Sequence, residues 1–447
     1  MLRMTHSTAL LTDMYELTMV DAALQDGTAS RRCVFEVFAR RLPGGRRYGV
    51  VAGIGRIIDQ LQDFHFTDEE IAYLRSAHVV SEHMLDYLSS YHFSGNLYGY
   101  AEGELYFPGS PILTATGTFA ECCLLETLLL SVLNHDSAVA TAASRMTAAA
   151  HGRPCVDFGA RRAHEGAAVA AARAAYVAGF VGTSDLEAGR LYGIPVSGTS
   201  AHAFTLLHDT EMDAFSAQIK AMGTGTTLLV DTYDTEQGVE HAVRAAEAAG
   251  GKLGAIRVDS GDLVAGAFKV RGQLDALGAT STKITVTNDL DEYALAALGS
   301  APVDGYGVGT RLVTGSGVPT AEMVYKMVAR ENAAGTVVPV AKRSAGKAGV
   351  GGFKVAGRLS RGERVSEELV LSCDSWEKGQ QALAERGARP LQVKLIDRGV
   401  INEQFGGRAG LEQARARHTA SRRELPDDAW RLSAGEPGIP TLMERVD

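Results

Sequence analysis

Seven short runs of apolar or β-branched residues recur between residues 155 and 308, separated by helical or loop stretches. The runs cover residues 155–158, 179–182, 195–197, 227–230, 254–258, 284–286 and 303–308. Strands that are joined by crossover segments pair in parallel. The pattern therefore predicts an α/β fold with a parallel sheet, which is either doubly wound or closed into a barrel.

Polar, charged or glycine-rich residues follow every one of these runs. The segments are PheGlyAlaArgArg (158–162), GlyThrSerAsp (182–185), GlyThrSerAlaHis (198–202), AspThrTyrAspThr (231–235), ArgValAspSerGlyAsp (257–262), AsnAspLeuAsp (288–291) and GlyValGlyThrArg (307–311). Barrels build their active sites where the strands end, and open α/β sheets also bind ligands there. Seven such ends in succession favour a barrel, because a barrel brings all of them to one shared site.

The chain on either side of these runs has a different character. A capping box at Thr118 and Glu121 begins a long helix that is rich in Ala and Leu. Within that helix, the apolar run 122–133 is interrupted by Glu126 and is shorter than a membrane span, so we expect a buried helix. Nearer the C-terminus, residues 367–371 and 391–396 predict strands and residues 411–421 predict a helix.

We predict three segments from these patterns. Residues 1–117 form the N-terminal part of a flanking α/β domain, and residues 118–341 form the α/β barrel with the active site. Residues 342–447 form a basic, flexible loop over 342–352 and a C-terminal segment that packs with the N-terminal domain.

Composition limits the partners and the compartment. The 447 residues carry a formal net charge of -9, and an acidic protein gains nothing from the counterion release that drives non-specific nucleic-acid binding. The five cysteines have spacings that support neither a zinc site nor a disulfide framework. Residues 1–12 contain no apolar stretch typical of a signal sequence. We expect a cytoplasmic protein that binds neither nucleic acid nor a membrane.

Two of the strand ends carry groups suited to a flat anionic ring or to nucleophilic chemistry. The aromatic face of Phe158 and the guanidinium groups of Arg161 and Arg162 could hold a carboxylated ring, or they could be a core Phe and two solvated arginines. His202 could be a base, a ligand or a nucleophile, although a lone His is more often structural.

Three other strand ends carry groups suited to phosphates. Arg257 with Asp259 and Asp262 could bind phosphates and a divalent ion, or could form a local cluster of salt bridges. The pair Asp289 and Asp291 is open to the same two interpretations. Residues 307–311 could cradle a phosphate with their backbone amides, or could form a tight turn. These residues together indicate a site for an anionic, phosphorylated small molecule without naming it.

These segments, in this order, resemble the nicotinate phosphoribosyltransferase family. The resemblance covers the chain to about residue 355 and is carried by several motifs: ThrAspMetTyrGluLeuThrMet (12–19), PheGlyAlaArgArgAla (158–163), GlyThrSer (182–184), GlyThrSerAlaHis (198–202), ArgValAspSerGlyAsp (257–262) and GlyValGlyThr (307–310). It implies an irregular TIM-like barrel of the type II phosphoribosyltransferase kind, with a second α/β domain formed by both chain ends. It also implies a homodimer with a shared active site.

The implied reaction joins nicotinate to phosphoribosyl pyrophosphate and releases pyrophosphate, in NAD synthesis or salvage. ATP is a co-substrate that is hydrolysed to ADP and phosphate, Mg²⁺ is the cofactor, and a phosphohistidine forms transiently. For the base, the resemblance implies that Tyr15 stacks on the pyridine ring from the neighbouring subunit and Phe158 stacks from its own. Arg161 or Arg162 lies near the carboxylate, and Ser184 favours nicotinate.

For the phosphates, the resemblance makes His202 the histidine that ATP phosphorylates. Arg257 and Asp259 join His202 as catalytic residues, and Asp259 and Asp289 hold Mg²⁺ beside the ribose and pyrophosphate. The residues implied to hold the 5′-phosphate are Gly307, Gly309 and Thr310.

Other functions stay open at this point. In the nicotinamide-using relatives an Asp occupies the position of Ser184 and a Gly follows the first Arg, whereas this chain has Ser184 and Arg162, with Asp185 adjacent. A quinolinate-type transferase would be shorter and would need no phosphorylated His. A silent metabolite sensor should have lost some of His202, Arg257 and Asp259, and a Schiff-base lyase would need a Lys at a strand end, where none of the seven ends has one.

Overall fold

The computed structural model describes residues 7–342 and 350–446, so residues 343–349 of the predicted basic loop lie outside the described residues. The chain divides into two compact units, Met1–Thr141 with Val318–Asp447, and Ala142–Gly317. The first division falls within the long helix α6 (Glu126–Ala149). The three-segment division at 117/118 and 341/342 stays a prediction.

The unit Ala142–Gly317 is built on a parallel sheet with the strand order β7-β6-β11-β10-β9-β8. Its strands are β6 (Cys155–Asp157), β7 (Gly182–Thr183), β8 (Thr227–Leu229), β9 (Ala255–Val258), β10 (Lys283–Val286) and β11 (Gly305–Val308). The seventh predicted run, 195–197, contributes an isolated parallel bridge from Val196 to Thr183 beside β7. All seven runs therefore lie in one parallel arrangement.

The order of the strands follows the chain around the sheet. β6, the first strand, pairs with β11, the last, and Cys155 lies opposite Tyr306. Within the described residues no strand pairing joins Val196 to β8, so the ring of strands is open at that point. The predicted barrel is thus found as a parallel half-barrel sheet in a mixed α/β structure.

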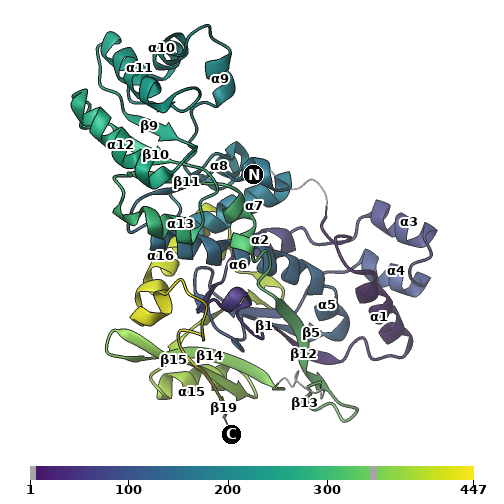
Figure 1. Cartoon of the computed structure of the whole chain (residues 1–447). Helices are drawn as coiled ribbons and strands as arrows, with labels where there is room; N and C mark the ends of the chain where they lie inside the picture. Colours follow the sequence, from purple (N-terminus) through teal and green to yellow (C-terminus); the bar gives the residue numbers. More distant parts are fainter. Residues whose placement is uncertain (1–6, 343–349, 447) are drawn as a thin grey trace. The chain divides into compact units, whose positions relative to one another are not determined.

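Crossover helices connect these strands, and Figure 1 shows α11 and α12 beside β9 and β10, with α10 beside α11. The helices of this unit are α7 (Glu165–Val177), α8 (Leu186–Tyr192), α9 (His202–Leu206), α10 (Glu211–Met222), α11 (Thr235–Ala248), α12 (Leu263–Ala276), α13 (Glu292–Ala297) and α14 (Thr310–Val313). An aspartate just beyond a strand end caps each of four helices, because its carboxylate accepts amide N–H groups of the first turn. These are Asp185 on α8, Asp234 on α11, Asp262 on α12 and Asp291 on α13.

The other unit contains an antiparallel sheet that draws strands from both ends of the chain, in the order β13-β12-β1-β5-β3-β17-β18. The strands are β1 (Arg32–Ala39), β3 (Asn96–Tyr100), β5 (Leu113–Thr118), β12 (Met323–Glu331), β13 (Val337–Pro339), β17 (Gln392–Asp397) and β18 (Val400–Ile401). β1 alternates between two cores: Phe35 and Val37 pack in one hydrophobic cluster and Val34 in another. This period of two is what a strand covered on both faces requires.

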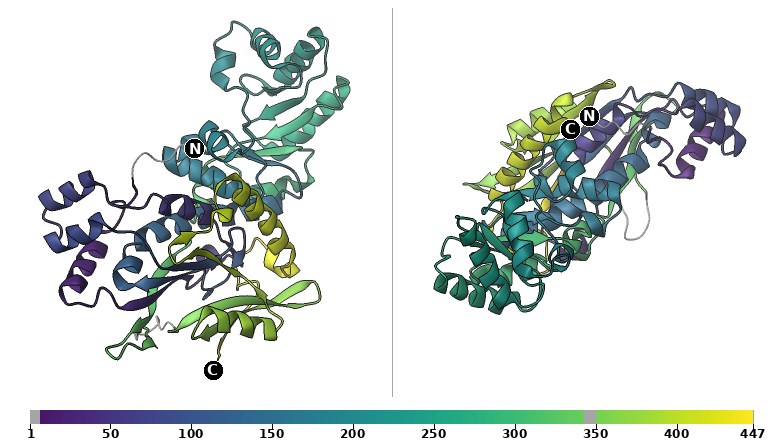
Figure 2. Two further views of the ribbon diagram at one scale, coloured as in Figure 1. Left: turned by 180° about the vertical axis from the view of Figure 1, so that it is seen from behind. Right: turned by 90° about the horizontal axis from the view of Figure 1, so that it is seen from above.

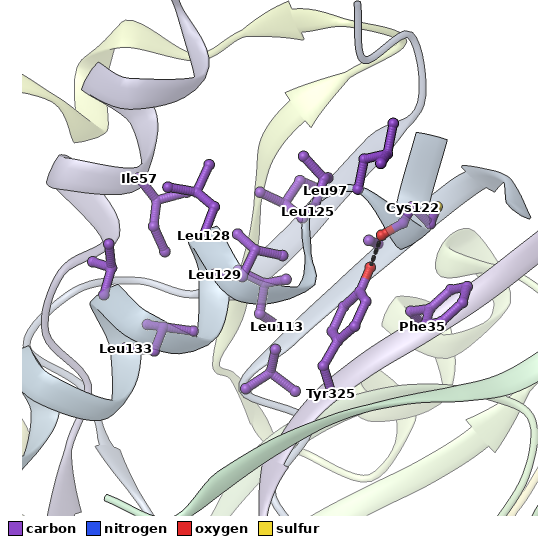
Figure 3. Close-up of a cluster of buried hydrophobic side chains, with 14 of the residues drawn as sticks. Phe35, Ile57, Leu97, Leu113, Cys122, Leu125, Leu128, Leu129, Leu133 and Tyr325 are labelled. Atoms are coloured by element: carbon purple, nitrogen blue, oxygen red, sulfur yellow. Dashed lines mark hydrogen bonds between the residues drawn. The ribbon is translucent and has the colours of Figure 1, made fainter. Parts of the chain in front are cut away.

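Helix α6 supplies much of the larger core of this unit. Figure 3 shows its Leu128, Leu129 and Leu133, which recur at helical spacing, together with Leu125 just before the helix and Leu113 of the sheet. Close by, the Tyr325 hydroxyl donates a 2.9 Å hydrogen bond to the carbonyl of Cys122. The stretch Phe119–Ala149 is long and apolar enough to cross a membrane, but 67% of its most apolar window is buried inside the protein. The prediction of a buried helix is confirmed.

The C-terminal region of the same unit forms a second sheet, in the order β16-β14-β15-β19. Its strands are β14 (Phe353–Arg361), β15 (Arg364–Cys373), β16 (Arg389–Pro390) and β19 (Thr441–Arg445). Views from opposite sides show α15 (Trp376–Glu385) against the β14–β15 hairpin (Figures 1 and 2). The predicted strands at 367–371 and 391–396 and the predicted helix at 411–421 are confirmed by β15, β17 and α16 (Gly407–Arg423).

Smaller elements complete this unit. They are α1 (Met14–Gln25), α2 (Ile54–Leu61), α3 (Asp68–Ser76), α4 (Glu82–Ser89), α5 (Phe119–Cys123), β2 (Gly49–Val50) and β4 (Leu105–Tyr106).

A buried cluster of charges ties distant segments of this unit together. The Arg358 side chain is 1% exposed and donates to Glu104 at 3.1 Å, and its guanidinium lies 3.4 Å from Glu368. Arg389 also donates to Glu104, at 2.7 Å. Burial by itself raises the pKa of Glu104, but Arg358 and Arg389 outweigh it and hold that pKa below its usual range. Burial keeps the pKa of Glu368 raised despite Arg358.

Replacing Arg358 with Ala should destabilise the protein by about 3–5 kcal/mol, because it leaves two buried carboxylates without their shared cation. Urea denaturation measures this change. The matched control is Arg364→Ala: Arg364 pairs with Asp427 on the surface, with side chains 50% and 91% exposed, and its loss should cost at most about 1 kcal/mol. Equal losses in the two variants would contradict a stabilising role for the buried cluster.

Candidate active site

The candidate site lies where strands β6 to β11 end, an edge that we call the carboxyl edge. There the structure brings together His202, the first residue of α9, with residues that follow β8 and β9. Nδ1 of His202 lies 3.1 Å from the Thr232 hydroxyl, and Nε2 lies 4.0 Å from a carboxylate oxygen of Asp259. The predicted neighbours His202 and Asp259, which are distant in sequence, are thus adjacent.

Asp259 is held by two neighbouring strand ends. The Thr287 hydroxyl donates to its Oδ1 at 2.5 Å, and its own backbone N–H donates to Asp231 Oδ2 at 2.7 Å. Ser260 also donates to Asp231, at 2.8 Å. Asp231 and Thr287 were not singled out by the sequence analysis. The available signal was that Asp231 opens the polar segment that follows β8.

Arg257 lies within β9 and donates to the carbonyl of Ser200 at 3.2 Å. Burial lowers the pKa of Arg257, Asp259 and Asp231 raise it, and the positive charge of Arg161 lowers it again. Arg161 is therefore close enough to repel Arg257, although it follows a different strand. Two positive charges near each other favour binding of an anion.

The Phe158 ring lies against β11 at the position of Gly307. A Cβ atom at Gly307 would stand 2.5 Å from the Phe158 ring and 2.6 Å from the Thr287 methyl group, closer than such atoms approach. Gly307 is buried within the strand, so its missing side chain makes room for the ring. Beyond it, Gly309 precedes α14 and Thr310 begins that short helix. Their binding of a 5′-phosphate stays a prediction.

The two arginines and Ser184 follow the ends of β6 and β7. Arg161 and Arg162 lie on one turn of 3₁₀ helix, and both are exposed. The backbone N–H of Ser184 donates to the carbonyl of Asp157 at 2.8 Å. Asp157, the last residue of β6, is 1% exposed and was missed by the sequence analysis. The signal for it was a single carboxylate inside the otherwise apolar run 155–158.

The remaining acidic residues of the carboxyl edge divide into helix caps and one strained turn. Asp262 and Asp291 cap helices, which favours the structural interpretation of both. Asn288 and Asp289 have φ angles of 98° and 27°, a positive-φ conformation that is uncommon for residues other than glycine, although Asn and Asp adopt it more readily than most, and that is found more often at functional sites. The described residues contain no group of three or more His, Cys, Asp or Glu side chains placed to hold a metal ion. Magnesium binding by Asp259 and Asp289 stays a prediction.

Tyr15 lies on α1 in the other compact unit and is 44% exposed. Burial of its hydroxyl and the neighbouring Glu126 carboxylate raise the pKa of Tyr15 above its usual range. Its stacking on a substrate from the neighbouring subunit stays a prediction.

Comparison with known proteins identifies the family. A model described as the nicotinate phosphoribosyltransferase N-terminal domain matches residues 10–134, and a model described as the nicotinate phosphoribosyltransferase family matches residues 154–348. The chain belongs to the nicotinate phosphoribosyltransferase family. The family resemblance predicted from sequence is confirmed, and so is the enzyme class.

Individual members of this family match most of the chain. The chain is 52% identical over 441 residues to nicotinate phosphoribosyltransferase pncB1 of Mycobacterium tuberculosis, covering 97% of this chain and 94% of that protein. It is 39% identical over 331 residues to the nicotinate phosphoribosyltransferase of Bacillus subtilis, covering 73% of this chain and 67% of that protein. The fold resembles that of human nicotinic acid phosphoribosyltransferase, with a TM-score of 0.79 at 24% identity over 97% of both chains.

The contact between Gly307 and Phe158 gives a test within a single strand. Gly307→Ala should displace the Phe158 ring and raise the KM for nicotinate by at least about ten-fold, since a misplacement of 1 Å can cost more than that. The matched control is Gly305→Ala in the same strand, where an added Cβ would meet its nearest neighbour at an ordinary 3.5 Å. Steady-state kinetics of both variants measure the effect. An unchanged KM in Gly307→Ala would show that the ring does not position the substrate.

Proposed function

We propose that the chain joins nicotinate to phosphoribosyl pyrophosphate to give nicotinate mononucleotide and pyrophosphate, with ATP hydrolysis coupled through a phosphohistidine at His202. The observation that carries this proposal is the meeting of His202, Asp259 and the strand ends beneath them at one edge of the half-barrel. Family membership supplies the reaction, and the arrangement of these groups supports their roles in it.

The part of the site that binds nicotinate would hold a flat, carboxylated ring. Phe158 lies beside the bare backbone of Gly307, where its ring would stack on pyridine. Arg161 and Arg162 are exposed nearby in sequence and would meet the carboxylate. The rival substrate nicotinamide is disfavoured because Asp185, the acidic neighbour of Ser184, caps α8 by accepting the Ala188 N–H at 2.9 Å.

The chemical step needs positioning more than proton transfer. The pyridine nitrogen attacks the anomeric carbon of the ribose, a carbon–nitrogen bond forms, and the carbon–oxygen bond to pyrophosphate breaks. The departing pyrophosphate keeps the electron pair. Because the attacking nitrogen carries no proton, the site needs no general base. The chain contributes by holding the ring and the phosphoribosyl group in line.

Two buried atoms at the carboxyl edge suit charged ligands. Arg257 Nε and Asp231 Oδ1 have no hydrogen-bond partner among the described residues, so the first could donate to a phosphate oxygen and the second could face a cation. Asp259 and Asp289 would hold Mg²⁺, a cation that prefers carboxylate and phosphate oxygens. When bound, Mg²⁺ supplies positive charge that stabilises the departing pyrophosphate.

His202 is placed to exchange a phosphoryl group. With its proton on Nδ1 and donated to Thr232, its Nε2 keeps a free lone pair, and the side chain is 40% exposed. Nε2 would attack the γ-phosphorus of ATP, forming a nitrogen–phosphorus bond as the bond to ADP breaks, and water would later release phosphate. The phosphoryl group would stand beside Asp259, and repulsion between these negative charges would couple ATP hydrolysis to the groups that hold pyrophosphate.

The active enzyme is proposed to be a homodimer in which Tyr15 of the partner subunit completes the site. Helix α1 and the residues before it expose Leu11 by 67%, Met14 by 60% and Met19 by 41%. An apolar surface next to Tyr15 supports burial against a second copy.

The role of His202 is tested by measuring nicotinate mononucleotide formation with Mg²⁺, with and without ATP. We expect strong stimulation by ATP in the wild type and none in His202→Ala, which should keep the basal rate within about ten-fold because the histidine is not needed for the attack. His208→Ala is the matched control, since His208 lies in the same segment and contacts the Phe204 carbonyl and ring, and this variant should retain the stimulation.

Equal stimulation of His202→Ala and wild type would discard the phosphohistidine while keeping the transferase. A clear preference for nicotinamide in the same assay would replace the proposed substrate. If the wild type formed no product with either nicotinate or nicotinamide, the metabolite-sensor hypothesis would be favoured instead.

A further inference from the structure

We propose that Asp157 is a positioning residue for nicotinate, which fixes the ends of β6 and β7 relative to each other. The inference rests on the proposed function and assigns a role to a buried residue that the proposed mechanism does not use.

The three oxygen atoms of Asp157 accept hydrogen bonds from two separate strand ends. Oδ1 accepts the backbone N–H of Gly159 at 2.7 Å, and Oδ2 accepts the Thr183 hydroxyl at 2.8 Å. The backbone carbonyl accepts the N–H of Ser184 at 2.8 Å. One buried residue thereby links the segment after β6 with the segment after β7.

The segment after β6 has little freedom to move once Gly159 is fixed. A Cβ atom on Gly159 would stand 2.3 Å from the Val313 side chain, so the turn fits closely against α14. The Gly159 carbonyl then accepts the N–H of Arg162 at 2.8 Å. Phe158 and both arginines of the proposed base site therefore follow the placement of this turn.

The segment after β7 is fixed through Thr183. Its hydroxyl donates to Asp157 and accepts the backbone N–H of Asp185 at 3.0 Å. The chain around Ser184, the proposed determinant for nicotinate, is thus held from both sides. The Asp157 carboxylate therefore fixes both the segment that carries Phe158 and the segment that carries Ser184.

This arrangement is unfavourable for an ionised carboxylate. Burial raises the pKa of Asp157, the bonds from Gly159 and Thr183 lower it only in part, and Asp185 raises it further. A raised pKa in the folded state means that stability falls as pH rises from the usual carboxyl range through the raised value. An amide at this position cannot ionise and escapes that loss. A costly group at a strand end is typical of positions kept for function.

Two conservative variants change the contact between Asp157 and Thr183 from opposite sides. In Asp157→Asn the amide oxygen can still accept from Gly159, but the NH₂ group faces the Thr183 hydroxyl, which loses its acceptor. Thr183→Val removes that hydroxyl and keeps the shape of the side chain. Asp234→Asn is the matched control, because Asp234 caps α11 at another strand end and Asn caps equally well.

The experiment measures KM for nicotinate, KM for phosphoribosyl pyrophosphate, kcat and Tm for these variants and for the double variant. We expect Asp157→Asn and Thr183→Val each to raise the KM for nicotinate by about ten-fold, with kcat and the other KM within about two-fold. The double variant should be no worse than Thr183→Val alone, because Thr183→Val already removes the hydroxyl that contacts Asp157. The Tm of Asp157→Asn at neutral pH should not fall, and Asp234→Asn should match the wild type.

Several outcomes would overturn the inference. An unchanged KM for nicotinate in both single variants would remove the positioning role, and so would a loss of all kinetic parameters in step with a lower Tm. Additive effects in the double variant would mean that the two residues act separately. A wild-type protein with no nicotinate turnover would instead overturn the proposed function, and this inference with it. Normal wild-type turnover with unaffected variants overturns the inference alone.

Discussion

Along the chain, β6 is the first strand of the unit Ala142–Gly317 and β11 is the last. In space the two strands pair in parallel, with Cys155 opposite Tyr306. This pairing bends the sheet back on itself, so the strand order follows the chain and every strand ends at the same edge. His202 and Asp259 meet there although 57 residues separate them in the sequence. Phe158 lies beside Gly307 for the same reason, because Phe158 follows β6 and Gly307 belongs to β11, the strand that pairs with β6.

The electrostatic potential at the carboxyl edge is less negative than the number of its carboxylates suggests. Asp185, Asp234, Asp262 and Asp291 each accept amide N–H groups at the start of a helix, where the helix dipole offsets a negative charge. Arg257 and Arg161 meanwhile place their positive charges close enough to repel each other. A protein with a net charge of -9 can therefore offer an anionic substrate a locally favourable field, as long as enough of its carboxylates have partners.

The architecture could be predicted from the sequence more fully than the contacts between distant residues could. Apolar runs and polar strand ends predicted the parallel sheet and its functional edge, because both follow from local pattern. The run 195–197 gave only a bridge, since it is short and exposed, with Val196 53% accessible. The pairing of β1 with β12 joins residues about 290 positions apart, and no local pattern encodes such a partner.

The candidate site divides in the same way. His202, Arg257 and Asp259 were found because they stand in polar segments, whereas Asp157 acquires its role from Thr183, which is 26 residues away. Gly307 was predicted to face a phosphate because glycine suggests close approach of a ligand. The structure adds a different neighbour for it, the Phe158 ring, which only folding brings there.

The interrupted construction of the larger unit has a consequence for synthesis on the ribosome. β1 ends at Ala39, and its neighbour β12 begins only at Met323. At about 5–20 residues per second, one edge of β1 stays without its partner for roughly 15 to 60 s after that strand is made. The chain in between contains the whole of Ala142–Gly317, whose own strands are all present before β12 emerges. The nascent protein thus carries an unpaired strand edge through most of its translation, a period in which it depends on being shielded from other chains.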